Sequence, residues 1–209
     1  MSLVMAFVTS DYILISGDKR ATFYKDTGEK VIKEDFQKIK KKNRNIILGF
    51  TGDVESFLKI QDFIEISSFT NDKLINTVSK QIFEISKQIY IKNKNDFNIM
   101  LGGINNDNRM EVNYFSTLEG FNLKTYIANK DDCVKFIDFC SDTSNGKPME
   151  IFLSIFNKSL LDTKQAKLML LYITQQIAKI DDSVNKKVDF LYLDKNKCEY
   201  SNNEELIKS

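Results

Sequence analysis

Segments typical of strands and segments typical of helices follow one another in blocks along this chain, and this order is its strongest constraint on the fold. Short apolar runs predict strands at 3–9, 12–16, 46–50, 97–104, 110–116, 123–128 and 187–193. Two helical segments lie between the third and fourth strands, and a helical block at 149–180, broken near 161–162, precedes the last strand. This order is not the strand-helix-strand alternation of a doubly wound sheet. We therefore expect an α+β fold, a four-layer αββα sandwich of two stacked antiparallel sheets.

Two of the helical segments carry apolar residues at helical spacing, which indicates one buried face on each helix. Thr70 is expected to cap the first of them. The two apolar faces are Leu74, Val78, Ile82, Ile85 and Ile89 in the first segment, and Ala166, Leu170, Ile173, Ile177 and Ile180 in the second.

Length and charge narrow the class of protein further. The 209 residues suit a single domain at 1–209 with a sizeable core. The 30 basic and 29 acidic side chains give a net charge of +1, which is not the basic excess of a nucleic-acid-binding protein. The basic run at 38–44 is interpreted as a solvated turn beside a strand.

No apolar run is long enough to cross a membrane and the start has no signal-peptide layout, so we expect a cytoplasmic protein without nucleic-acid or membrane partners.

Metal and cofactor sites are not expected from the motifs present. Cys133, Cys140 and Cys198 show no C-x-x-C spacing, which argues against a disulfide scaffold or a cysteine metal site. Gly102-Gly103 lacks the spacing of a dinucleotide-binding loop, so we expect a close-packed strand there. The acidic pairs Asp131-Asp132 and Asp181-Asp182 have the ligand type of a hard cation, but paired surface carboxylates ordinarily hold none.

The chain contains no histidine. This absence excludes histidine-dependent serine or cysteine triads, histidine-ligated zinc and imidazole acid–base catalysis. An enzyme with this sequence would need a carboxylate, a lysine, a tyrosine or a terminal amine as its base.

Four features fall in order within the first third of the chain: a serine at position 2, a turn at 17–22, a lysine at 38 and a strand end at 50–52. The turn alone is also interpretable as an ordinary strand end with solvated charges. Together the four features resemble the proteasome β-subunit family of N-terminal-nucleophile hydrolases, in which a nucleophile, an apolar strand and a hairpin precede Asp-x-Arg-Ala-Thr. The matching residues here are Ser2-Leu3-Val4-Met5-Ala6, Ser16-Gly17-Asp18-Lys19-Arg20-Ala21-Thr22, Lys38-Ile39 and Phe50-Thr51-Gly52.

The resemblance implies that Ser2 is the nucleophile once Met1 is removed, and that its own α-amino group is the base. Such an amine has a pKa of about 7.7–8.0, which suits it to accept the serine proton without histidine. The resemblance further implies that Lys38 lowers the pKa of the nucleophile and that Asp18 orients Lys38. Because Lys33, Lys40 and Lys41 lie nearby in the sequence, they remain competing candidates for the lysine.

The resemblance also implies where a peptide substrate would bind. The backbone N–H of Gly52 would donate to the oxyanion. Thr22 would pair with an extended peptide as an added strand, and Thr51 and Arg20 would belong to the same oxyanion and substrate-binding region. The implied partner is thus a peptide or protein substrate, in a protein that forms a homo-oligomer in the manner of this family.

Two segments depart from the family pattern. The Gly-Ser-Gly segment expected after the strand at 123–128 is replaced by residues 129–132, and the Asp-x-x-Ser-Gly segment is reduced to Asp181-Asp182-Ser183. The start Met-Ser-Leu-Val-Met-Ala-Phe, followed by Gly-Asp-Lys-Arg, resembles the connectases, proteasome-related protein ligases of methanogenic archaea. The sequence therefore predicts an enzyme that acts on a peptide bond through an acyl-ester at Ser2, as a protease or as a transpeptidase. The alternative is an inactive proteasome-like subunit with a binding or assembly role.

Overall fold

The computed structural model describes residues 2–24, 27–66, 74–130, 134–156 and 162–208. Within these ranges the strands form two five-stranded sheets and one two-stranded sheet, and all paired strands are antiparallel. The first five-stranded sheet has the order β10 (Lys135–Phe139), β1 (Val4–Val8), β2 (Tyr12–Asp18), β11 (Val188–Asp194) and β12 (Cys198–Asn202). The second has the order β5 (Ile39–Asn43), β6 (Ile46–Gly52), β7 (Phe97–Ile104), β8 (Met110–Ser116) and β9 (Lys124–Ile127).

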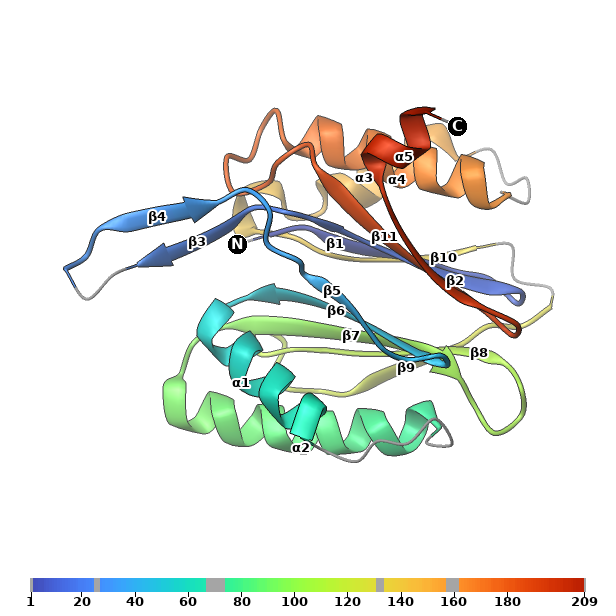
Figure 1. Cartoon of the computed structure of the whole chain (residues 1–209), viewed down its shortest axis with the longest axis horizontal. Helices are drawn as coiled ribbons and strands as arrows, with labels where there is room; N and C mark the ends of the chain where they lie inside the picture. Colours follow the sequence, from blue (N-terminus) through green and yellow to red (C-terminus); the bar gives the residue numbers. More distant parts are fainter. Residues whose placement is uncertain (1, 25–26, 67–73, 131–133, 157–161, 209) are drawn as a thin grey trace.

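The two-stranded sheet is a hairpin of β3 (Ala21–Tyr24) and β4 (Lys30–Lys33). It projects from the end of the molecule at which the N-terminus lies (Figure 1). The hairpin follows β2 after only two residues and leads into β5, so it connects the first five-stranded sheet to the second.

Helices cover the outer side of each five-stranded sheet (Figure 1). Helices α3 (Lys147–Ile155), α4 (Thr163–Ile177) and α5 (Asn203–Lys208) lie on the first sheet, and α1 (Val54–Ile66) and α2 (Ile75–Asn93) lie on the second. Apolar clusters fill the space between the first sheet and its helices, between the two sheets, and between the second sheet and its helices. The predicted α+β fold with antiparallel sheets is therefore confirmed.

Strand β1 shows why its sequence is a continuous apolar run. Met5 and Phe7 pack toward α3 and α4, whereas Val4 and Ala6 pack toward the second sheet. Because both faces of the strand are buried, the polar residues that alternate with apolar ones in a solvated strand are absent. The strand that begins beside Ser2 is thus held rigidly from both sides.

The apolar face predicted for α4 is confirmed up to the end of the helix, whereas the face predicted for α2 is confirmed only in part. Val78 and Ile82 of α2 are buried, but Ile85 and Ile89 are half-buried. All four predicted residues of α4 from Ala166 to Ile177 are buried. Leu74 is 39% exposed because it precedes the first helical turn, and Ile180 is 53% exposed because α4 has already ended. Thr70 and Leu161 lie outside the described residues. The break predicted near 161–162 corresponds to Asp162, whose side chain accepts a hydrogen bond from the Gln165 N–H and forms a capping box.

The solvated turn predicted at 38–44 is wrong, because this basic segment forms β5 at the edge of the second sheet. An edge strand tolerates lysines on its exposed side, and Ile39 still packs between the sheets.

The sequence also does not predict β3, β4, β10 and β12. All of these strands lie at sheet edges or in the projecting hairpin, where one side is unpaired and the apolar pattern is weak.

The close-packed strand predicted at Gly102-Gly103 is confirmed in β7. A Cβ at Gly102 would lie 3.0 Å from Ile13 of the other sheet, and one at Gly103 would lie 2.8 Å from Cβ of Ile75 in α2. Both neighbours approach closely because these positions have no side chain.

Cys140 and Cys198 are free thiols, and Cys133 lies outside the described residues. Among the described residues, no helix is both long and apolar enough to cross a membrane.

Candidate active site

The structure brings four of the seven predicted site residues to one small pocket. Ser2 lies two residues before the start of β1, with 6% of its surface exposed. It lines a pocket of about 40 Å³ together with Thr22 of β3, Lys38 before β5 and Gly52 at the end of β6. The remaining lining residues are Ala21, Phe36, Phe50 and Val54. Segments from the first sheet, the hairpin and the second sheet therefore meet at this point.

Lys38 and Asp18 form a buried ion pair next to Ser2. The Lys38 Nζ lies 2.5 Å from Asp18 Oδ1, and both side chains are almost fully shielded from solvent. The same Asp18 oxygen accepts a hydrogen bond of 2.8 Å from the Leu3 N–H, and the Asp18 N–H donates to the Leu3 carbonyl at 3.1 Å. Asp18 thus connects the lysine to the residue that follows Ser2.

The competing lysines lie elsewhere. Lys33 is exposed on β4, with its Nζ over the Phe23 ring. Lys41 is exposed and donates to the Cys198 carbonyl, and Lys40 lines a different cavity, under α1. Of these four lysines, Lys38 is the one that shares a pocket with Ser2.

Burial lowers the pKa of Lys38, because the ammonium loses its water, and the Asp18 carboxylate opposes this shift only in part. Taking two charges out of water costs several kcal/mol per ion, and attraction between them offsets that cost only when the geometry is good. Such an arrangement is more common at functional sites than in the remainder of a protein. Ser2 therefore shares its pocket with a lysine whose ammonium group gives up its proton more readily than that of an exposed lysine.

Gly52 is at a position that only glycine occupies without strain. Its φ is +105°, and a Cβ there would lie 2.4 Å from the Asp96 carbonyl oxygen. This conformation ends β6 and turns the chain into α1, where Asp53 accepts a hydrogen bond from the Ser56 N–H at 2.7 Å. The backbone thereby runs along the pocket wall with no side chain in the way.

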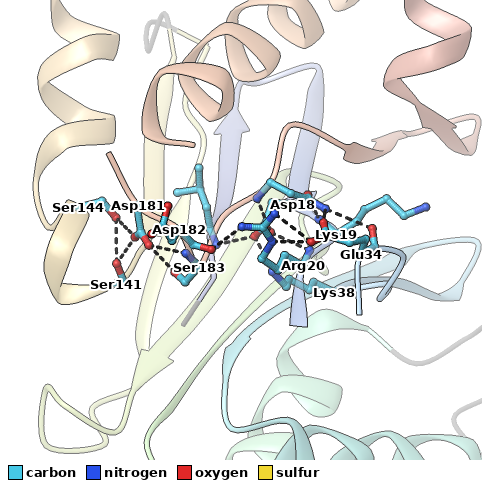
Figure 2. A network of polar contacts seen from close by, with 12 residues as sticks. Asp18, Lys19, Arg20, Glu34, Lys38, Ser141, Ser144, Asp181, Asp182 and Ser183 are labelled. Carbon is cyan, nitrogen blue, oxygen red and sulfur yellow. Dashed lines mark hydrogen bonds and ion pairs between the residues drawn. The ribbon is translucent and has the colours of Figure 1, made fainter. Parts of the chain in front are cut away.

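Besides Asp18, two predicted site residues do not line the pocket. The Arg20 guanidinium donates to Glu34 Oε1 at 2.9 Å and to the Asp182 carbonyl at 2.5 Å (Figure 2). Thr51 is buried, and its hydroxyl oxygen accepts a hydrogen bond of 2.8 Å from the Asn98 side chain of β7. Their side chains hold the surrounding segments together.

A second polar cluster lies beside the pair, around the buried carboxylate of Asp181 (Figure 2). The hydroxyls of Ser141 and Ser144 donate to its Oδ2, the latter at 2.9 Å, and Ser183 donates to Oδ1 through its N–H at 2.9 Å and its hydroxyl at 2.6 Å. Burial raises the pKa of Asp181, but the hydrogen bonds from Ser141 and Ser183 outweigh it, so this pKa lies below its usual value.

Sequence reasoning did not single out Ser141 and Ser144, which lie between β10 and α3. It names residues 129–132, of which 131 and 132 lie outside the described residues, as the replacement for a Gly-Ser-Gly segment. Ser141 and Ser144 were missed together with β10, the strand that precedes them. A signal was present, because a run of strand type at 135–139 precedes Ser141-Asp142-Thr143-Ser144-Asn145-Gly146 and a proline in the first turn of a helix.

The fold is that of an α+β protein with two antiparallel five-stranded sheets and helices on their outer sides, and it is shared with solved structures of Anbu proteins. An Anbu (Gly-1) mutant from Hyphomicrobium sp. strain MC1 aligns with a TM-score of 0.73 and 13% identity over 96% of this chain and 85% of that chain. Anbu (ancestral beta-subunit) from Yersinia bercovieri aligns with a TM-score of 0.70 and 14% identity over 95% and 86%. The Anbu complex from Pseudomonas aeruginosa, described as a helical assembly, aligns with a TM-score of 0.75 and 13% identity over 96% and 86%.

No family model and no curated protein matches the sequence. The resemblance to proteasome β-subunits and to archaeal connectases is wrong at the level of the family, because these structural neighbours are Anbu proteins, a distinct bacterial family. The motifs at Ser2, Asp18 and Lys38 are short segments at strand ends, and they do not distinguish one family from another. At 13–14% identity the likeness shows the fold.

Proposed function

We propose that this chain is an N-terminal-nucleophile enzyme that acts on a peptide bond through an acyl-ester at Ser2. The observation that carries the proposal is the buried Lys38–Asp18 pair, whose lysine shares a pocket with Ser2 and whose aspartate binds the Leu3 N–H. A pair of this kind weakens the fold unless well compensated, so its position beside a hydroxyl favours a chemical role.

The proposed reaction needs a free α-amino group on Ser2, and therefore removal of whatever precedes that residue. As Ser2 Oγ bonds to the substrate carbonyl carbon, its proton passes to the α-amino group. That proton then moves to the leaving amine as the peptide C–N bond breaks, and an ester of Ser2 remains. Lys38 stabilises the developing negative charge, Asp18 orients Lys38, and the Gly52 N–H donates to the oxyanion. Water or a second peptide amine resolves the ester, which gives hydrolysis or transpeptidation.

The size of the pocket favours a small residue on the acyl side of the bond. A cavity of about 40 Å³, walled by Phe36 and Phe50, has room for about three water-sized groups, fewer than the heavy atoms of a large side chain. The Phe50 ring is itself fixed by stacking on Phe57, with ring centroids 4.5 Å apart. We expect peptides with glycine or alanine at this position to be cleaved faster than matched peptides with leucine or phenylalanine. A preference for the large residues would contradict the proposed pocket.

The proposed substrate is an extended peptide, because Thr22 lies on the hairpin strand that borders the pocket. Arg20 and Thr51 support this binding region through their contacts with neighbouring segments. We further propose that residues 1–209 form a single domain, a four-layer αββα sandwich, which assembles into a homo-oligomer. The helical assembly of the Pseudomonas aeruginosa protein supports the last point, and light scattering after size-exclusion chromatography tests it.

The decisive experiment begins with the mature N-terminus. Intact mass should show that Ser2 is the first residue of the isolated protein. Incubation with an activated peptide ester should then add one acyl group to Ser2, and the Ser2→Ala variant should gain none. Product analysis with and without an added peptide amine separates hydrolysis from transpeptidation. The matched control is Ser10→Ala, in the turn after β1, which should acylate at the rate of the unmodified protein.

A non-catalytic subunit is the second candidate function. The observation that favours it is the restricted access to the site, since Ser2 is 6% exposed and the pocket is small. A protein that retains Met1, or one that starts at Ser2 and gains no acyl group, would support this candidate over the enzyme.

A further inference from the structure

One buried amide contacts the segments on both sides of the Lys38–Asp18 pair. Asn185 lies between α4 and β11 and is buried. Its Oδ1 accepts a hydrogen bond of 3.0 Å from the Lys19 N–H, and its Nδ2 donates to the Glu34 carbonyl at 3.2 Å and to Glu34 Oε2 at 2.7 Å. The Asn185 backbone N–H also points at Asp18 Oδ2, at 3.4 Å.

These contacts fix the two ends of the ion pair relative to each other. Lys19 directly follows Asp18, and Glu34 lies four residues before Lys38. The side chain of Asn185 therefore ties the end of β2 to the segment that leads from the hairpin to Lys38. An amide has two donor hydrogens and one acceptor oxygen, and Asn185 uses both kinds of group here. Few other side chains offer this combination at this length.

The contacts also decide which oxygen of Asp18 faces the lysine. The Arg20 N–H donates to Oδ2 at 2.9 Å, on the same side as the Asn185 N–H. Oδ1 is left to Lys38 and to the Leu3 N–H. Arg20 adds a parallel connection, because its guanidinium joins Glu34 to the Asp182 carbonyl in the segment that carries Asn185 (Figure 2).

We propose that Asn185 is a positioning residue that holds the Asp18 carboxylate against Lys38 and the Leu3 N–H. Its catalytic consequence rests on the proposed function, whereas its structural consequence does not. Loss of the side chain lets the Asp18 backbone move away from the Lys38 segment, so that the carboxylate no longer holds a single orientation. Because the Leu3 N–H donates to this carboxylate, movement of the carboxylate also affects the position of Ser2, the residue before Leu3.

Amide hydrogen exchange measured by NMR tests the structural consequence. In Asn185→Ala the Leu3 and Arg20 amides, which both donate to Asp18, should exchange about tenfold faster relative to the other β1 and β2 amides. Asn105→Ala is the matched control, because Asn105 is equally buried and makes three side-chain hydrogen bonds in the β7–β8 turn. It should leave the exchange at Leu3 and Arg20 unchanged. Equal exchange in Asn185→Ala and the unmodified protein would overturn the proposal.

Kinetics test the catalytic consequence. In Asn185→Ala the maximal rate constant for acylation of Ser2 should fall about tenfold or more while the peptide concentration at half-maximal rate stays within about twofold. A purely destabilising effect would leave the rate of the folded fraction unchanged, and that result would overturn this part of the proposal. If the unmodified protein is never acylated, the proposed function fails, and the exchange measurement still decides the role of Asn185.

A charge variant keeps the test usable if Asn185→Ala does not fold. Asn185→Asp retains the acceptor for the Lys19 N–H but replaces the donor with an oxygen that faces Glu34. It should speed exchange at Leu3 and Arg20, and adding Glu34→Gln, which supplies a donor from the other side, should slow it again. Exchange in Asn185→Asp that matches the unmodified protein would overturn the proposal.

Discussion

Both ends of the stacked sheets carry charged side chains, but these side chains are buried at one end and not at the other. At the N-terminal end, Lys38 and Asp18 are buried together beside a pocket of about 40 Å³. At the opposite end, where the β1–β2, β7–β8 and β11–β12 turns meet (Figure 1), a cavity of about 320 Å³ is lined by Asp11, Arg109 and Lys195 among others. None of these three charged residues is buried. The buried ion pair, which costs free energy of folding, lies at the smaller of the two cavities. The burial of charge, and not the volume of the cavity, therefore distinguishes the candidate active site.

Of the substitutions that test this comparison, removal of Lys38 is expected to change stability and acylation the most. Lys38→Met leaves the Asp18 carboxylate buried without its partner, so we expect the free energy of unfolding to fall by about 3–5 kcal/mol and acylation of Ser2 to be lost. Lys195→Met at the opposite end should change stability by less than about 0.5 kcal/mol. Urea unfolding at pH 7 measures both variants. Adding Asp18→Asn to Lys38→Met should recover part of the loss, and equal stability of the two lysine variants would break the comparison.

The next largest effect is expected at Gly52. Gly52→Ala forces a Cβ toward the Asp96 carbonyl and onto a positive φ, so it should destabilise the protein by about 2–5 kcal/mol. Gly28→Ala is the control, because Gly28 has φ +80° with nothing within 4 Å of an added Cβ, and it should cost about 1–2 kcal/mol. Thermal unfolding measures the stability of both variants. The difference between their losses gives the contribution of the contact between the added Cβ and the Asp96 carbonyl. Similar losses would show that backbone conformation alone matters.

The smallest effect concerns Asp181 and depends on pH. Its pKa is lower in the folded protein than the value of about 3.9 in an unfolded chain, so its contribution to stability is present above about pH 4 and disappears as the pH falls through the folded pKa. Asp181→Asn should therefore lower stability by about 1–3 kcal/mol at pH 7 and by progressively less in acid. Asp11→Asn, at the exposed turn, should change little at either pH. A loss for Asp181→Asn that stays constant down to pH 2 would contradict the role of its ionised form.

The central strands of the fold could be predicted from the sequence, whereas of the edge strands only β9, at 124–127, could. β7 and β8 have the predicted bounds, 97–104 and 110–116, because their apolar residues face packed layers on one or both sides. β10 contains Lys135 and Asp138, and it is a strand because it pairs with β1, which is more than 120 residues earlier in the chain. A local pattern carries no information on such a partner.

The candidate site shows the same limit. Asp18 and Lys38 could be connected only through a family resemblance, since their spacing in the sequence does not show that the two side chains meet. Ser2, Lys38 and Gly52, which that resemblance singled out, line one pocket, although the resemblance pointed to the wrong family. Asn185 could not have been found, because its hydrogen bonds reach residues about 150 and 166 positions away.

The pairing of β1 has a consequence for the order in which the ribosome completes this site. β1 lies between β2 and β10, and the Asp18 carboxylate beside it contacts the Asn185 N–H. Ser2 and β1 are synthesised long before β10 and Asn185, so the chain through Asn185 must leave the ribosome before the surroundings of Ser2 are complete. A nascent chain would carry Ser2 in an unorganised segment, and the pocket around it would form only after Asn185 has emerged.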